Sequence, residues 1–192
     1  MNWEAFRKEI RNCTVCPLHL TRKHALPGEG NIHARIFMIA QAPGPVEDQS
    51  GSMFTGPSGP HLDHLLAIAE LDREQIYITN LIKCFLPKCR RPSRNEINAC
   101  SPYLLRELEA VNPELIVPLG FHATRFLLMH WNLPRPERKK FHFLFGKVFH
   151  AGRYSVYPLR HPTALLFDPL KKPVMEENYR NLGEFIDKYL EE

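Results

Sequence analysis

Short apolar runs alternate along the chain with sets of apolar residues at helical spacing. The runs are rich in β-branched and aromatic residues and predict four strands, at 35–41, 75–82, 114–119 and 154–158. The helical spacing predicts helices at about 3–10, 62–69, 93–110, 121–130 and 174–190. Ser93 and Glu96 form a capping box at the start of the third helix. Strands that alternate with helices favour a parallel sheet covered on both faces. We therefore expect one α/β domain over residues 1–192, a three-layer α/β/α fold with a central, mainly parallel four-stranded sheet.

Polar side chains follow the predicted strands, where a sheet of this kind binds ligands. The loops after the four strands begin beyond Gln41, Asn80, Leu119 and Pro158, and we expect them to converge on one site. Asn80 can both donate and accept, as reading a nucleobase edge requires. Phe54 lies in a Gly-rich loop, where an exposed ring is free to stack on a flat ligand, and His161 can donate to a leaving base. Each residue also has a structural interpretation, as a strand-end amide, a loop anchor or a turn cap.

The cysteines suggest a metal site. Cys13 and Cys16 form a CxxC pair, Cys84 follows the second predicted strand, and Cys100 lies 16 positions later, inside the capped helix. Four thiolates hold either a tetrahedral zinc or an iron–sulfur cluster, and the spacing leaves both open, with a slight preference for a cluster because only one pair is close. The alternative is a set of buried thiols. Cys89 is the fifth cysteine and is expected to be a free thiol.

Charge adds a hint of nucleic-acid binding. The net charge is only +4, but residues 83–94 hold five basic residues and no acidic one, and 135–147 form a second basic cluster. Such clusters attract phosphates, although an ordinary solvated surface has the same composition. No apolar run approaches the roughly 20 residues that a membrane span needs, and the first residues do not form a secretory leader. We expect a location inside the cell, where structural disulfides are rare.

The order of these motifs resembles the family 4 uracil-DNA glycosylases, across roughly residues 10 to 185. The resemblance is carried by CxxC at 13–16, APG at 42–44 with ED at 47–48, an aromatic residue in a Gly-rich loop, YITN at 77–80 followed by Cys84, and HP at 161–162. The segment 76–100 is the most specific part, since it joins the base-reading Asn to both later cysteines. The resemblance implies a prokaryotic cytoplasmic enzyme that works as a monomer on uracil-containing DNA, with no membrane partner.

The resemblance also implies roles for individual residues. It assigns a structural [4Fe–4S] cluster, with zinc less favoured, to Cys13, Cys16, Cys84 and Cys100. It implies that Phe54 stacks on a flipped uracil, that Asn80 hydrogen-bonds the pairing edge, and that His161 contacts O2 as negative charge develops there. Gln41 and Ala42 would complete the catalytic and base-binding set. DNA contacts are expected from Lys83, Arg90 and Arg91, with Leu165 or a neighbour wedged into the duplex.

One position departs from the family pattern. The family has GEAPG or GEGPG where this chain has AQAPG, so Gln41 replaces an acid. A glutamine cannot act as a general base, although its carbonyl can orient a water. Glu47 and Asp48 are the nearest carboxylates in sequence that could point inward. We therefore expect a slower enzyme or an altered base preference. The alternatives are a glycosylase for other deaminated or mismatched bases, and a metal-binding nucleic-acid module without catalysis.

Overall fold

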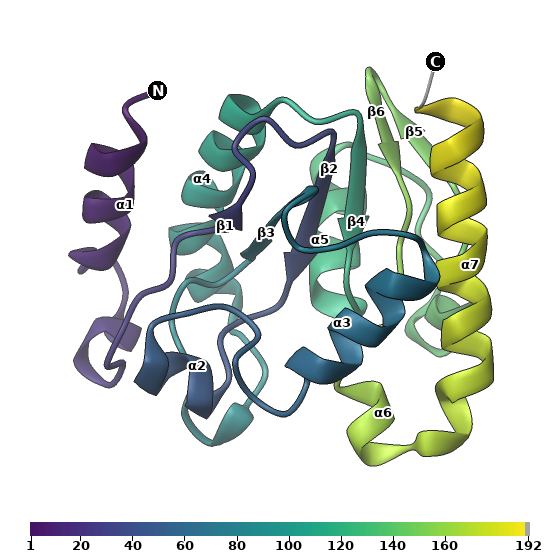
Figure 1. Cartoon of the computed structure of the whole chain (residues 1–192). Helices are drawn as coiled ribbons and strands as arrows, with labels where there is room; N and C mark the ends of the chain where they lie inside the picture. Colours follow the sequence, from purple (N-terminus) through teal and green to yellow (C-terminus); the bar gives the residue numbers. More distant parts are fainter. Residues whose placement is uncertain (191–192) are drawn as a thin grey trace.

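The computed structural model describes residues 1–190, and their strands form one sheet flanked by helices on both faces (Figure 1). The sheet order is β1-β3-β2-β4-β6-β5. The strands are β1 (Glu29–Gly30), β2 (Ile36–Ala40), β3 (Ile76–Asn80), β4 (Leu115–Pro118), β5 (Phe149–Ala151) and β6 (Tyr154–Val156). The four inner strands are parallel, as expected. The three-layer α/β fold is confirmed, but the expected four-stranded sheet is extended by β1 and β5, which pair antiparallel at its edges.

The helices follow the expected order, with two additions. They are α1 (Trp3–Arg11), α2 (Pro45–Ser50), α3 (Gly59–Ile68), α4 (Arg94–Val111), α5 (Phe121–His130), α6 (Ala164–Phe167) and α7 (Lys172–Tyr189). Within residues 1–190, four short 3-10 helices lie at Pro17–Leu20, Pro87–Cys89, Arg138–Leu144 and Pro169–Lys171. The short helix α2 falls between the first predicted strand and the helix predicted at 62–69, where the sequence predicts no helix. Its six residues are too few and too polar to give an apolar period, and Gly51 ends it with φ of +78°. Among residues 1–190, no helix is both long and apolar enough to cross a membrane.

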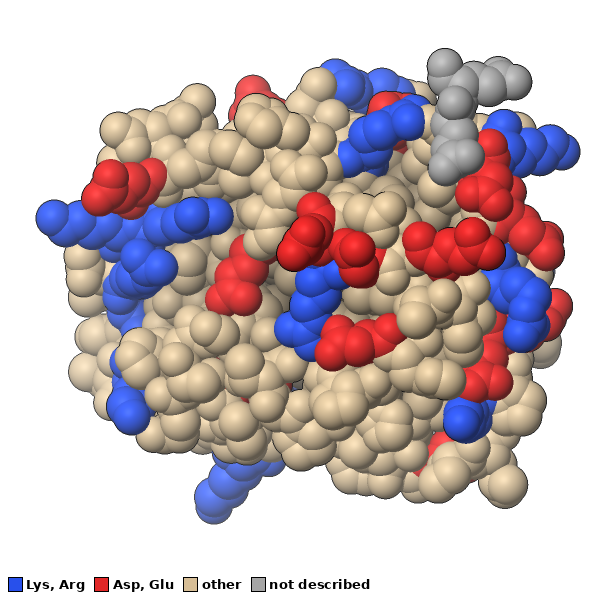
Figure 2. All heavy atoms as spheres, viewed as in Figure 1, with Lys and Arg blue, Asp and Glu red and all other residues tan. Residues whose placement is uncertain are grey.

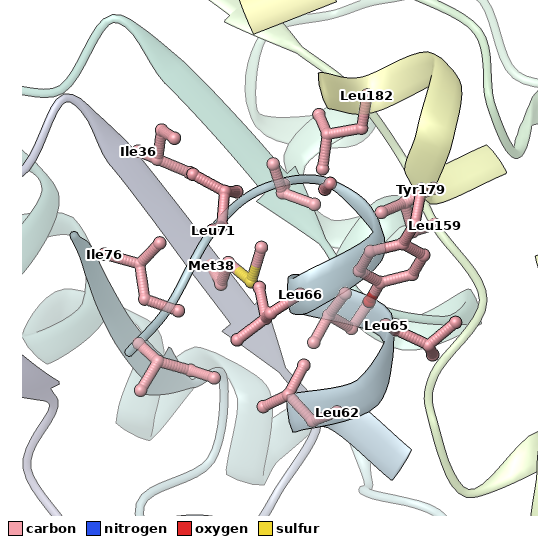
Figure 3. Packing of buried hydrophobic residues seen from close by; sticks show 14 of the residues in the cluster. Ile36, Met38, Leu62, Leu65, Leu66, Leu71, Ile76, Leu159, Tyr179 and Leu182 are labelled. Atoms are coloured by element: carbon pink, nitrogen blue, oxygen red, sulfur yellow. The ribbon is translucent and has the colours of Figure 1, made fainter. Parts of the chain in front are cut away.

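One face of the sheet is covered by α3 and α7 (Figure 1). Leu62, Leu65 and Leu66 of α3 are each at most 1% exposed, because their spacing places them on one side of the helix. Figure 3 shows this side packed toward Met38 of β2, with Tyr179 of α7 beside it. Burial of side chains of this size contributes about 1.5–3 kcal/mol each. This layer fixes the loops on either side of α3.

The opposite face is covered by α1, α4 and α5. The capping box predicted for α4 is present: the Glu96 N–H donates to Ser93 Oγ (3.2 Å), and the Ser93 N–H donates to Glu96 Oε2 (2.7 Å). This cap fixes the first turn of α4 and hence the position of Cys100 two turns later, on the buried side of the helix. The layer therefore carries the cysteines, while the α3 and α7 layer supports the loops after the strands.

Sheet register brings the strand ends together. Asn80 at the end of β3 lies opposite Ala40 at the end of β2. Beyond β4 the chain pairs once more, where Leu119 and Leu159 form a parallel bridge. The loops after β2, β3, β4 and β6 therefore leave the same edge of the sheet, the lower edge in Figure 1. The convergence expected from the sequence is present.

Candidate active site and cysteine cavity

A small pocket opens at this edge, with a volume of about 100 Å³. Ala42, Phe54, Asn80 and His161 of the sequence-predicted set line it. Gln41 lies instead on a neighbouring groove of about 440 Å³, which shares His161 with the pocket. Sites for drug-sized ligands occupy roughly 300–1,000 Å³, so the pocket is suited to a single small ring and the groove to something longer.

Asn80 presents its amide to the pocket from a rigid position. The side chain is 2% exposed, and Nδ2 lies 3.0 Å from the sulfur of Met53, another pocket residue. A thioether is a weak acceptor, so a better acceptor entering the pocket would replace it. The backbone carbonyl of Asn80 accepts from Lys83 Nζ at 2.9 Å, which fixes the end of β3.

Phe54 is buried rather than exposed, so the expectation of an exposed ring is wrong. It is 6% exposed and lies in the hydrophobic core that also holds the α3 leucines, while still lining the pocket. Its φ is +51°, a strained value for a residue with a side chain. Arg73 holds this conformation by donating to the carbonyls of Met53 (3.3 Å) and Phe54 (3.1 Å). The ring is thus preorganised, with its centroid 5.7 Å from the His161 ring and the planes 21° apart.

His161 is held as a neutral ring with a defined tautomer. The Thr163 backbone N–H donates to Nδ1 (3.2 Å), and the Thr163 hydroxyl lies 2.8 Å from the same atom. A backbone N–H can only donate, so Nδ1 is the acceptor and Nε2 carries the proton of the neutral ring. Burial lowers the pKa of His161 to about 4. Gly120 packs against this ring, because a Cβ there would lie 3.2 Å from the His161 Cβ.

Glu47 supplies the carboxylate that the APG motif lacks. It is 7% exposed, lines the pocket, and accepts from the Gly56 N–H at 2.9 Å through Oε1. Gly44 leaves room for it, since a Cβ at Gly44 would lie 2.4 Å from Glu47 Oε2. The neighbouring Asp48 does not reach the pocket and instead accepts from the backbone N–H groups of Lys23 and His24. Sequence reasoning left both carboxylates as candidates, and α2 separates them, because consecutive residues of a helix do not face the same way.

The four predicted cysteine ligands line one cavity on the α4 side of the sheet. Hydrogen bonds reach two of the sulfurs: Arg22 Nη1 lies 3.3 Å from Cys84 Sγ, and the Lys83 N–H lies 3.2 Å from Cys100 Sγ. Burial raises the pKa of Cys84, and it raises the pKa of Cys100 to about 12. Within residues 1–190 no three His, Cys, Asp or Glu side chains are arranged as ligands of a single metal ion. Cys89 is exposed and lines the groove.

Two expected DNA contacts conflict with burial. Lys83 is 1% exposed and forms an ion pair with Glu107 of α4, so its ammonium does not reach the surface. Leu165 is 6% exposed because it packs into the core. The next two residues, Leu166 and Phe167, are 41% and 87% exposed and line the groove.

The two remaining basic residues of the loop are exposed, and one of them reaches the groove. Arg90 lines it while pairing with Glu96 through two hydrogen bonds of 2.5 and 2.9 Å. Arg91 is exposed, and with Arg125 and Arg138 it helps to lower the pKa of His122, after burial as the main cause. In the view of Figure 2, Asp and Glu gather over the middle and right of the molecule, while the lower edge over α2 is mostly uncharged.

Comparison with known proteins places this site in a family. Residues 27–184 match the model of the uracil DNA glycosylase superfamily. The type-4 uracil-DNA glycosylase of Saccharolobus solfataricus is 40% identical over 188 residues, which cover 95% of this chain and 86% of that protein. The type-4 enzyme of Archaeoglobus fulgidus is 37% identical, covering 94% and 92%. That of Sulfurisphaera tokodaii is 35% identical, covering 94% and 83%.

Proposed function

This chain belongs to the type-4 branch of the uracil-DNA glycosylase superfamily, and we propose that it excises uracil from DNA by hydrolysis of the N-glycosidic bond. The observation that carries the proposal is the convergence of Phe54, Asn80 and His161 on one small pocket. The three side chains offer a stacking surface, a hydrogen-bonding edge and a neutral donor, which are the groups that a flipped pyrimidine needs. The enzyme must extrude the nucleotide, at a cost of a few kcal/mol.

Recognition of the base would use Phe54 and Asn80. Stacking on an aromatic ring contributes about 1–3 kcal/mol per base and offsets much of the extrusion cost. The Asn80 amide can donate through Nδ2 and accept through Oδ1, which matches the O4 acceptor and N3–H donor of uracil. Both groups are fixed before the base enters, because Arg73 holds the Phe54 backbone and Lys83 holds the Asn80 carbonyl. Preorganisation of this kind reduces the entropy lost on binding.

Bond cleavage would leave an oxocarbenium-like sugar and a uracil anion. The Nε2–H of His161 would donate to that anion, and a neutral donor suits the role because the ring keeps its proton. Glu47 is the carboxylate of the pocket, and its negative charge would favour the cationic sugar and orient the attacking water. The Gln41 carbonyl would assist in holding that water from the groove side. No lysine lines the pocket within residues 1–190, which supports hydrolysis without a covalent lysine intermediate.

The groove beside the pocket would hold the DNA strand. Arg91 is exposed and Arg90 lines the groove, so we assign the phosphate contacts of the basic loop to these two residues in place of Lys83. Contacts of this kind position the protein but carry no sequence information. Phe167 replaces Leu165 as the proposed wedge, because it is 87% exposed and lines the groove, against 41% for Leu166 beside it.

We infer that the cysteine cavity holds an iron–sulfur cluster rather than a single zinc ion. Cys13, Cys16, Cys84 and Cys100 line a common space, yet they are not gathered tightly enough to form a ligand set for one ion. A zinc ion needs four donors at about 2.3 Å. N–H donors aimed at Cys84 and Cys100 suit thiolate ligands, whose charge they stabilise. Such a cluster would tie the N-terminal segment to α4 and supply structure rather than the hydrolysis.

A uracil-release assay tests the proposal. Wild-type protein should release uracil from duplex and single-stranded DNA, and Asn80→Ala and His161→Ala should each abolish most of the activity. Matched duplexes with hypoxanthine, xanthine or a thymine mismatch test for another base preference. No uracil release at any enzyme excess would refute the proposal, and release that survives both substitutions would refute the residue assignment. Visible absorption with iron and sulfide analysis of anaerobically purified protein separates a cluster from zinc.

A further inference from the structure

A buried ion pair lies between the pocket and the cysteine cavity. The side chains of Lys83 and Glu107 are 2% and 0% exposed, and Lys83 Nζ lies 2.6 Å from Glu107 Oε2. The other two ammonium protons are directed to the Thr79 hydroxyl (2.6 Å) and the Asn80 carbonyl (2.9 Å). Glu107 also accepts from the Thr79 hydroxyl (2.7 Å) and the Gly28 N–H (2.8 Å). Every proton of the ammonium therefore has an acceptor.

Stability alone does not explain this pair. Removing two charges from water costs more than a typical buried pair regains, and uncharged replacements of similar shape are often neutral or stabilising. A complete network such as this one does, however, fix the geometry of the groups that it joins. The residues joined here are the last two of β3, of which Asn80 is the proposed base reader.

The same lysine also contacts the cysteine cavity. Its backbone N–H donates to Cys100 Sγ at 3.2 Å, and the next residue in the chain is Cys84. Glu107 lies on α4 about two turns beyond Cys100, so both ends of the ion pair belong to segments that carry a cysteine. Lys83 is thus in contact with both a wall of the cysteine cavity and the backbone of the pocket residue.

We propose that Lys83 is a positioning residue that sets the orientation of Asn80 in the pocket and mechanically links this residue to the cysteine site. The inference rests on the proposed function, since it takes Asn80 to read the base. The charged pair is maintained for the geometry of the β3 end rather than for stability. Its removal should therefore weaken uracil binding without a matching loss of stability.

The main test removes both charges and keeps the side-chain shapes, in the double variant Lys83→Met with Glu107→Gln. Its resistance to urea should be close to that of wild type, whereas its affinity for free uracil should fall about 10- to 100-fold, the scale of a small misplacement at a site. The matched control is Arg106→Met with Glu9→Gln, an exposed pair between α4 and α1 with contacts of 2.6 and 2.9 Å. The control should leave uracil affinity unchanged.

A double-mutant cycle asks whether Lys83 acts through Asn80. In an Asn80→Ala background the double variant should cause little further loss of uracil affinity, because the group that it positions is gone. Thr79→Val removes one contact of the Lys83 ammonium and should give a smaller loss of uracil affinity. This variant replaces the double variant in the test if the double variant does not fold. Unchanged affinity in both variants, or full additivity with Asn80→Ala, would overturn the proposal.

Two further measurements separate this inference from neighbouring explanations. Iron content is measured for every variant, and a loss of iron that accounts for the whole loss of affinity would assign Lys83 to the cysteine site alone and overturn the proposal. The Asn80 side-chain amide signal in NMR needs no substrate, and it should shift or broaden in the double variant. An unchanged signal in the double variant overturns the positioning role of Lys83. This result is independent of the uracil-release assay, in which no release by wild-type protein would refute the proposed function.

Discussion

Partly buried and neutral, His161 should make the stability of the protein depend on pH in a defined window. The pKa of His161 is lowered from 6.5 to about 4 because burial disfavours the charged ring. The unfolded chain therefore binds a proton that the folded chain does not, at any pH between these values. The free energy of unfolding should be fully retained above pH 6.5 and fall as the pH drops toward 4.

The size of the effect follows from the shift. A difference of about 2.5 pKa units corresponds to about 3 kcal/mol in total, of which about 2.5 kcal/mol is reached by roughly pH 4.5. The control is His161→Gln, whose side chain stays uncharged at every pH. Acid also protonates other groups, but those losses are common to both proteins and cancel in the difference.

Urea denaturation near pH 7 and at about pH 4.5 measures this difference. Wild type should lose about 2.5 kcal/mol more than His161→Gln between the two conditions. Equal losses in the two proteins would refute the reasoning, as would an NMR titration of the His161 ring with a midpoint near its ordinary value. The same neutral ring predicts that protonation of His161 does not limit kcat/KM between about pH 5.5 and 8.

Three further predictions test the rest of the site. Glu47→Gln should leave the affinity for free uracil nearly unchanged and lower the single-turnover rate of uracil release about 100-fold, because a neutral amide no longer favours the cationic sugar; an unchanged rate would exclude Glu47 from the chemistry. Phe167→Ala should lower excision from duplex DNA about 5- to 30-fold, as expected for about 1–2 kcal/mol of lost wedging, and spare single-stranded substrate; equal losses on both substrates would contradict a wedge. Cys84→Ser should reduce iron content and thermal stability whereas Cys89→Ser should change neither, and iron lost from both variants would refute the assignment of the ligands.

The sequence predicts the parts of the fold that depend on local pattern. The inner strands are runs of apolar residues that are buried on both faces, so they stand out without any tertiary information. The edge strands β1 and β5 have two and three residues, and such short segments carry no period. They form because β3 and β6 offer free backbone groups at the sheet edges. These groups become available only through the tertiary structure.

The site shows the same division. Asn80 and His161 follow strands, so the general rule for parallel sheets finds them. The burial of Lys83 could not be read from its basic neighbourhood, because its partner Glu107 is 24 residues away on another element. A signal was nevertheless present: Glu107 lies one turn from Tyr103 and one turn from Val111 on a helix, so a charged residue occupies the apolar side and requires a buried partner.

The burial of Phe54 also depends on contacts that the sequence around it does not reveal. Glycines around an aromatic residue suggest an open loop, but here they allow the chain to fold back over α3. A Cβ at Gly59 would lie 2.1 Å from the Phe54 carbonyl oxygen, so the loop closes tightly enough to bury the ring. The glycine content predicts that such a loop is flexible, but it does not predict which path the loop follows in the folded protein.

The order of the strands in the sheet has a consequence for synthesis on the ribosome. β2 lies between β3 and β4, so one of its edges stays bare until Leu115–Pro118 has emerged. At roughly 5–20 residues per second, the 35 residues from Asn80 to Leu115 take about 2 to 7 seconds. During that interval the nascent chain exposes the edge of a strand whose five residues are all buried in the finished protein, a template for pairing with other chains. All four proposed cluster ligands have been synthesised by residue 100, before β4 covers that edge. The metal site can therefore assemble before the sheet is complete.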